Sequence, residues 1–144
     1  MKNNSAVLIF LVDDDALFLK SLEIGFIQET PYRIMTYAKG EDCINALSEK
    51  PDIIILDYLL DGIDKNAMNG IQTLDKIKAA NAEIPVIMLS AQDKIKVAVN
   101  CMHHKAYDYV VKSETAFIRL QKLITIILKG NIMEKELNWY MDRM

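Results

Sequence analysis

The sequence lacks any apolar run long enough to cross a membrane, which needs about 20 consecutive apolar residues. Its first apolar run (AVLIFLV, 6–12) is too short for the core of a signal peptide and is followed by three acids. A helix-turn-helix segment and a basic patch are also missing, and the formal net charge is -3. We therefore expect a cytoplasmic protein that binds neither a membrane nor nucleic acid directly.

Cysteine is scarce, and its two positions form no metal-type cluster. Cys43 and Cys101 lie far apart, each in an apolar segment with helical spacing. We expect both to act as small hydrophobic residues in or near the core, with a redox or disulfide role as the alternative. Low-complexity linkers and internal repeats are absent as well. A chain of 144 residues with 51% hydrophobic content can build one core and is too short for two ordinary domains.

Five short apolar runs alternate with five longer segments of helical spacing. Several of the runs are continuous rather than alternating, which is typical of strands covered on both faces in a parallel sheet. A strand followed by a helix, five times over, predicts a doubly wound three-layer α/β/α fold. We expect the strand order 2-1-3-4-5. The predicted strands are 6–12, 32–37, 52–56, 84–89 and 107–111.

The last part of the chain predicts an extra C-terminal helix over 131–144, following a main domain over 1–130. Gly130 suits the position just after a helix end, and Asn131 with Glu134 resembles a helix N-cap with its box partner. Apolar residues then recur at helical spacing, at Met133, Leu137, Tyr140 and Met144. This helix either folds back on the domain, which we favour, or begins a linker or coiled coil.

Polar residues stand at the ends of four of the predicted strands. They are Asp13, Asp14 and Asp15 after the first, Asp57 after the third, Ser90 after the fourth and Lys112 after the fifth. Ligands of open α/β sheets bind at the carboxyl ends of the strands. Because the first and third strands are neighbours in the expected order, we expect Asp13, Asp14 and Asp57 to lie close together.

Clustered carboxylates repel one another and raise each other's pKa, so a divalent cation among them would keep them ionised. Mg²⁺ is a hard ion that takes oxygen ligands. An aspartate can also act as the nucleophile in phosphoryl transfer and form an aspartyl phosphate. Lys112 and the Ser90 hydroxyl could then neutralise and bind the phosphoryl oxygens. Simpler roles stay open: the acids can cap a helix, for which we choose Asp15, and Lys112 can be a solvated charge.

Five segments together resemble the response-regulator receiver family of two-component systems over about residues 6–128: FLVDDDALFLKSL, PDIIILDYLL, NGIQTLDKIK, PVIMLSAQD and AYDYVVKSE. The resemblance implies that Asp57 accepts a phosphoryl group from a sensor histidine kinase or a histidine phosphotransfer protein. It implies a Mg²⁺ site of Asp57, Asp14, Asp13 acting through water, and the Leu59 backbone carbonyl. It further implies that Ser90 and Lys112 contact the phosphoryl group, and that Tyr109 swings inward when Ser90 moves.

The sequence departs from the family pattern at three places. Asp61 replaces the usual proline, and about five extra residues then lengthen the loop at 61–67, which could gate the site, contact a partner or be tolerated surface. Ser113 stands where a proline joined through a cis bond is usual. Leu59 replaces a common polar side chain and cannot orient a hydrolytic water, so we expect a long-lived phosphoryl group, with Gln92 as a second position that could tune its lifetime.

Other functions and partners also follow from the sequence. A Mg²⁺-dependent phosphohydrolase would need a second acid, which Asp57-Tyr58-Leu59 lacks, so we expect no enzyme turnover beyond slow autodephosphorylation. The alternatives are an adaptor that works without phosphorylation, or the receiver half of a transcriptional regulator. A homodimer could form through the fourth helix, fifth strand and fifth helix, although the charges there suit a solvated surface equally well. Those charges are Lys94, Lys96, Asp108 and Arg119.

Overall fold

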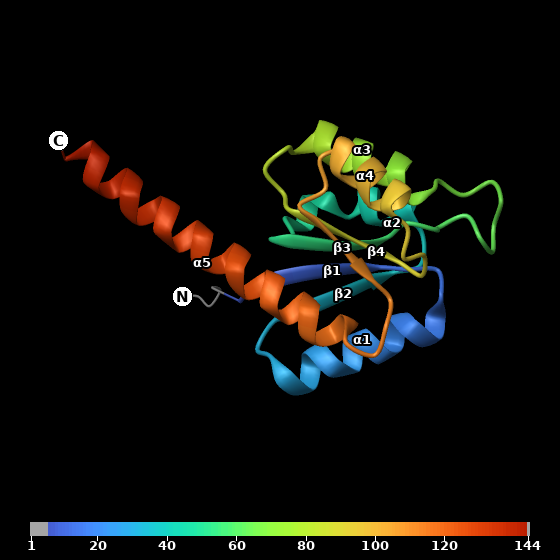
Figure 1. Cartoon of the computed structure of the whole chain (residues 1–144). Coiled ribbons are helices and arrows are strands. Elements are labelled where there is room, and N and C mark those ends of the chain that lie inside the picture. Colours follow the sequence, from blue (N-terminus) through green and yellow to red (C-terminus); the bar gives the residue numbers. More distant parts are fainter. Residues whose placement is uncertain (1–5, 144) are drawn as a thin grey trace.

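The computed structural model describes residues 6–143 and is built on a sheet of five parallel strands in the order β2-β1-β3-β4-β5 (Figure 1). The strands are β1 (Leu8–Val12), β2 (Arg33–Tyr37), β3 (Ile53–Asp57), β4 (Val86–Ser90) and β5 (Asp108–Val111). Every residue of β1, β3 and β4 is buried, as the continuous apolar runs predict. The predicted fold class and strand order are confirmed.

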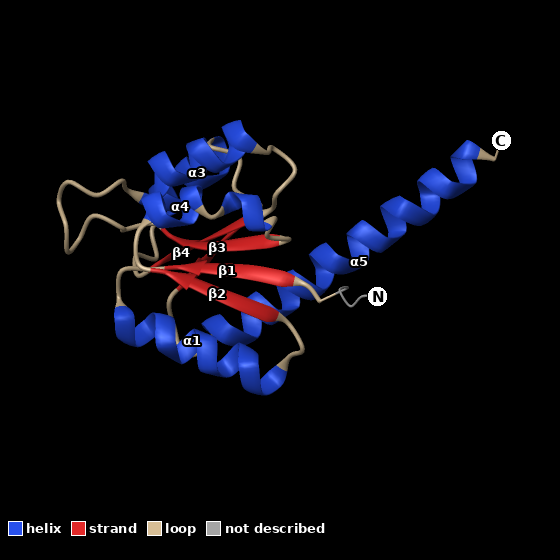
Figure 2. Cartoon of the chain, turned by 180° about the vertical axis from the view of Figure 1, so that it is seen from behind, coloured by secondary structure: helices blue, strands red, loops and turns tan. Residues whose placement is uncertain are grey.

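Helices cover both faces of the sheet and make two separate cores (Figure 2). The helices are α1 (Ala16–Glu29), α2 (Gly40–Asn45), α3 (Gly70–Ala80), α4 (Ile95–His103) and α5 (Ala116–Asp142), with a 3-10 turn at Leu47–Glu49. Strand side chains alternate between the faces. Phe10 and Val12 therefore join the core under α2, α3 and α4, whereas Ile9 and Leu11 join the core with α1 and α5.

Both cysteines lie in the core beneath α2, α3 and α4, as expected from their apolar surroundings. Cys43 and Cys101 are fully buried. Burial raises the pKa of the Cys43 thiol to about 12 and that of the Cys101 thiol to about 11. Both side chains are therefore protonated near neutral pH and pack as small hydrophobic groups.

The end of the chain corrects two expectations. α5 is one continuous helix of 27 residues, so a helix end at Gly130 and a new start at Asn131 are wrong. A glycine inside a helix costs only about 1 kcal/mol, which the hydrogen bonds of the following turns offset. The favoured fold-back is also wrong, because residues 131–143 are exposed and project away from the sheet (Figures 1 and 2). Met144, the last member of the expected stripe, lies outside the described residues.

Within residues 6–143, no helix combines the length and hydrophobicity of a membrane span.

Candidate acidic site at the carboxyl end of the sheet

The register of the strands places the polar strand-end residues side by side. Val12 on β1 lies opposite Leu56 on β3, so the residues that follow each of them, Asp13 and Asp57, come next to each other. On the other side, β4 lies between β3 and β5, and Ser90 on β4 pairs with Val111 on β5. Lys112 follows β5 directly and donates its backbone N–H to the Ser90 carbonyl at 2.8 Å.

The turn after β1 is fixed by two carboxylates. Asp15 caps α1, and one of its oxygens accepts the backbone N–H groups of Leu17 and Phe18 at 3.1 and 3.2 Å. Asp13 accepts the Asp15 N–H at 2.9 Å. Asp15 therefore has the capping role expected for it, while Asp13 and Asp14 are held at the sheet edge.

Three carboxylates converge at this edge. Asp13, Asp14 and Asp57 each offer an oxygen, and these oxygens all lie within 4.8 Å of one another. Asp13 is 1% exposed and Asp57 is 3% exposed, whereas Asp14 is half-buried. Because buried like charges at such distances repel strongly, the arrangement calls for nearby positive charge.

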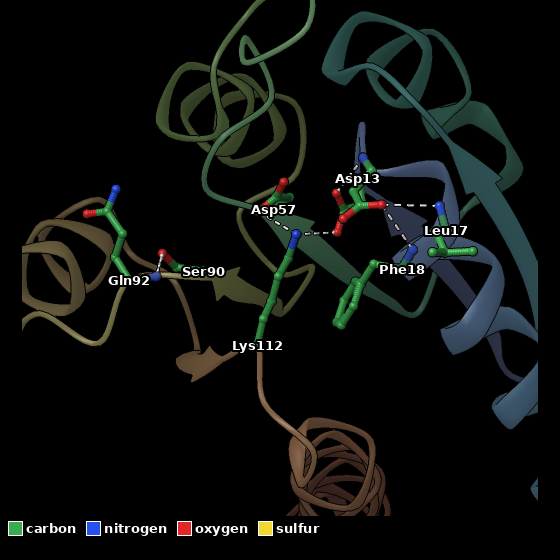
Figure 3. Close-up of polar contacts among 8 residues, drawn as sticks. Asp13, Leu17, Phe18, Asp57, Ser90, Gln92 and Lys112 are labelled. Carbon is green, nitrogen blue, oxygen red and sulfur yellow. Dashed lines mark hydrogen bonds and ion pairs between the residues drawn. The ribbon is translucent and has the colours of Figure 1, made fainter.

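Lys112 supplies part of that charge. Its Nζ lies 2.8 Å from Asp13 Oδ2 and 3.4 Å from Asp57 Oδ1, between the two carboxylates (Figure 3). The ammonium also lies 4.7 Å from the centroid of the Phe18 ring. Burial lowers the pKa of Lys112, but the Asp13 and Asp57 carboxylates outweigh it and raise the pKa above its ordinary value. Lys112 reaches this position although Ser113 follows it, and all described peptide bonds are trans.

Asp57 is the carboxyl group most affected by the site. Burial first, and then the negative charge of Asp13, raise its pKa from 3.8 to about 8 against the opposing charge of Lys112. Without a further cation, Asp57 therefore retains a proton near neutral pH. A divalent cation beside these oxygens would favour the ionised form, which is the form that can act as a nucleophile.

Ser90, Gln92 and Tyr109 are linked to one another beside the cluster. Ser90 is 3% exposed, and its hydroxyl accepts the Gln92 N–H at 3.0 Å (Figure 3). The half-buried Tyr109 donates its hydroxyl hydrogen to the Gln92 carbonyl and packs against the core beneath α4. The turn between β4 and α4 thus connects the strand-end hydroxyl with the β5 tyrosine.

The lengthened loop after β3 borders the acidic cluster and is tied to α2. Lys39 Nζ lies 3.3 Å from Asp64 Oδ2, and the Met68 N–H donates to a Glu41 carboxylate oxygen at 2.8 Å. A Cβ added to Gly62 would lie 3.6 Å from an Asp14 oxygen. The middle of the loop projects from the domain (Figure 1).

Two residues that line the site, Phe18 and Gly70, were not among the site residues predicted from the sequence. Phe18 lies against Lys112 from the first turn of α1, where its apolar character gave no hint of this contact. A Cβ at Gly70 would lie 2.4 Å from the Asp57 carbonyl oxygen and 2.6 Å from that of Tyr58, so only glycine fits there. Its place directly after the Asn69 cap of α3 was the available clue.

Comparison with known proteins agrees with this fold. The family model described as response regulator receiver domain matches residues 9–125. A transcriptional regulatory protein of Streptomyces coelicolor, AfsQ1, is 32% identical over 124 residues, which cover 85% of this chain and 52% of that protein. The first curated relatives are longer proteins, of which this chain spans about half or less.

Solved structures show the same architecture. The signal receiver domain of a putative Luxo repressor protein from Vibrio parahaemolyticus has a TM-score of 0.77 and 27% identity, covering 92% of this chain and 97% of that one. A BeF3-activated DrrB receiver domain has a TM-score of 0.74 and 27% identity, covering 86% and 98% of the two chains. The chain belongs to the response-regulator receiver family of two-component systems.

Proposed function

We propose that Asp57 of this receiver domain accepts a phosphoryl group, and that the resulting aspartyl phosphate switches the domain between two signalling states. The convergence of Asp13, Asp14 and Asp57 beside Lys112 is the observation that carries the proposal. In the transfer, the P–N bond of a phosphohistidine on a histidine kinase or phosphotransfer protein breaks, and a P–O bond to an Asp57 oxygen forms.

The residues at the site fit Mg²⁺. All three side chains offer carboxylate oxygens, the ligands that this ion prefers, within 4.8 Å of one another. Asp13, Asp14, Asp57 and the Leu59 backbone carbonyl would hold the ion. Bound there, it would supply positive charge for the carboxylates and for the phosphoryl oxygens. A neighbour of the same fold is described as BeF3-activated, which agrees with a site that receives a phosphoryl-like group.

The remaining site residues would respond to the new group. Lys112 already lies 3.4 Å from an Asp57 oxygen, so it can pair with an added phosphoryl oxygen after a small shift. The Ser90 hydroxyl, which now accepts a hydrogen bond from the Gln92 N–H, would move to form a hydrogen bond with the phosphoryl group. Because the Tyr109 hydroxyl is hydrogen-bonded to the Gln92 carbonyl, a movement of Ser90 that shifts Gln92 would also displace the Tyr109 ring. Leu59, which is 53% exposed, offers no polar group to orient a hydrolytic water.

Partners would bind next to the site and on the neighbouring α4 surface. The proposed donor is a sensor histidine kinase or a histidine phosphotransfer protein, which agrees with the cytoplasmic location expected from the sequence. Ile95, Val99 and Met102 on α4 are 83%, 50% and 48% exposed, which supports a docking or dimer surface formed with β5 and α5. We propose that the domain acts as a switch without enzyme turnover of its own.

Intact mass spectrometry tests the proposal directly. The wild type and Asp57→Asn are incubated with Mg²⁺ and acetyl phosphate, and a single phosphoryl adduct is expected on the wild type alone. Asp15→Asn is a matched control, because it removes a nearby carboxylate while asparagine still caps α1. It should be phosphorylated like the wild type. A folded wild type that gains no adduct would instead favour an adaptor that works without phosphorylation.

A further inference from the structure

The second half of α5 carries apolar side chains that its own domain leaves uncovered. All of residues 131–143 are exposed, and the helix runs past the end of the sheet that lies opposite to the carboxyl ends of the strands (Figures 1 and 2). Met133 is 67% exposed, Leu137 58% and Tyr140 64%. Single exposed apolar residues are common, but a row of them along one helix indicates an interaction surface.

The face that α5 turns toward its own core ends where the domain ends. Its buried residues are Ala116, Leu120, Ile124 and Ile127. At about 3.6 residues per turn, the same face continues through Asn131, Glu134 and Asn138, which are all polar. The extension is therefore not built to pack back onto its own sheet.

A second face of α5 is apolar and has a different spacing. Ile126, Met133, Leu137 and Tyr140 are separated by seven, four and three residues, the heptad spacing of coiled coils. We call this apolar row along α5 the seam. Gly130 occupies the heptad position between Ile126 and Met133, and a Cβ added to it would have no atom within 4 Å. The seam over 126–140 is about 21 Å long.

Charged residues flank the seam in a complementary way. Lys129 and Glu134 lie on its two sides, five residues apart, and both are exposed. In a parallel coiled coil whose two helices are in the same register, the residue just before a seam position on one helix lies opposite the residue five positions further along the other helix. Lys129 of each copy would then pair with Glu134 of the other, giving two ion pairs related by a two-fold axis.

We propose that this chain self-associates with a second copy through residues 126–143 of α5, as a parallel two-stranded coiled coil. The seam is short, but the folded domain already forms the first turns of α5. The unfavourable nucleation step that limits short isolated helices is therefore complete before the two copies meet. The surface lies away from Asp57 and does not rest on the proposed phosphorylation.

Sedimentation equilibrium of the full chain over a wide concentration range tests the charge pairing. The wild type is expected to dimerise reversibly, and Glu134→Lys should weaken the dimer about tenfold by placing like charges opposite each other. The double variant Lys129→Glu/Glu134→Lys should restore wild-type affinity. Asp142→Lys makes the same charge change on the outer face of the helix, and it should leave association unchanged. Circular dichroism confirms that each variant is folded.

Disulfide cross-linking tests the orientation and register. Met133→Cys lies in the seam and should form a covalent dimer under mild oxidation with dissolved oxygen, whereas Lys135→Cys on the outer face should not. Cys43 and Cys101 are buried and do not compete. A wild type that stays monomeric, a dimer indifferent to charge at Glu134, or equal cross-linking at both positions would each overturn the proposal.

Discussion

Replacing Asp57 by asparagine should stabilise the metal-free protein at neutral and alkaline pH while abolishing phosphorylation. Asparagine keeps the shape of the side chain and removes its charge. Asp57 is 3% exposed and shares its surroundings with the buried Asp13, so the ionised form is costly in the folded state. The substitution therefore removes the free-energy cost of a second charged carboxylate buried beside Asp13.

The size of the effect follows from the pKa of Asp57, which is about 8 in the folded chain against a reference value of 3.8. Below the reference value both states are protonated, and the carboxyl group imposes no penalty. Between the two values the unfolded chain has released its proton and the folded chain has not, so stability falls by about 1.4 kcal/mol per pH unit. Over the roughly four pH units between the two values, the loss grows to on the order of 5–6 kcal/mol near pH 8, and above that pH it is complete.

Urea unfolding of the wild type and Asp57→Asn, from about pH 5 to about pH 8 in a chelator, measures this loss. Titrating groups far from the site are common to both proteins, so the difference between their free energies of unfolding reports Asp57 together with its charged neighbours Asp13 and Lys112. The advantage of the variant should grow with pH. Added Mg²⁺ should stabilise the wild type more than the variant. A difference that stays constant across this pH range would refute the reasoning.

Three further substitutions test individual contacts. Leu59→Asn should shorten the lifetime of the phosphoryl group, which mass spectrometry measures after the phosphodonor is removed. An unchanged decay rate would contradict the proposed effect of Leu59 on this lifetime. Gly70→Ala would place a methyl group 2.4 Å from the Asp57 carbonyl oxygen. It should destabilise the domain by about 1–3 kcal/mol in urea unfolding and slow phosphorylation, whereas wild-type behaviour in both would contradict the packing described. Gly130→Ala meets no atom and should stabilise the chain by about 0.5–1 kcal/mol at concentrations where it is monomeric. A lower stability would mean that the glycine is needed in the folded monomer.

The sequence by itself determined the fold class and the place of the acidic cluster. Continuous apolar runs are typical of strands buried on both faces in a parallel sheet, and neighbouring parallel strands are usually joined by helices, which supply the alternating segments of helical spacing. Once the strand order is known, the carboxyl ends of β1 and β3 are neighbours, so Asp13, Asp14 and Asp57 have to meet. The capping role of Asp15 was equally local, because it depends only on the residues that follow in α1.

Only the tertiary structure decided the close contacts and the course of α5. The positions of Phe18 beside Lys112 and of Gly70 against the Asp57 backbone depend on how separate elements pack, which no local pattern records. The apparent helix boundary at Gly130 was misleading because capping preferences amount to only about 1 kcal/mol. The folded domain nucleates α5 and carries the helix through the glycine, and the polar continuation of its core-facing side leaves the last turns projecting into solvent.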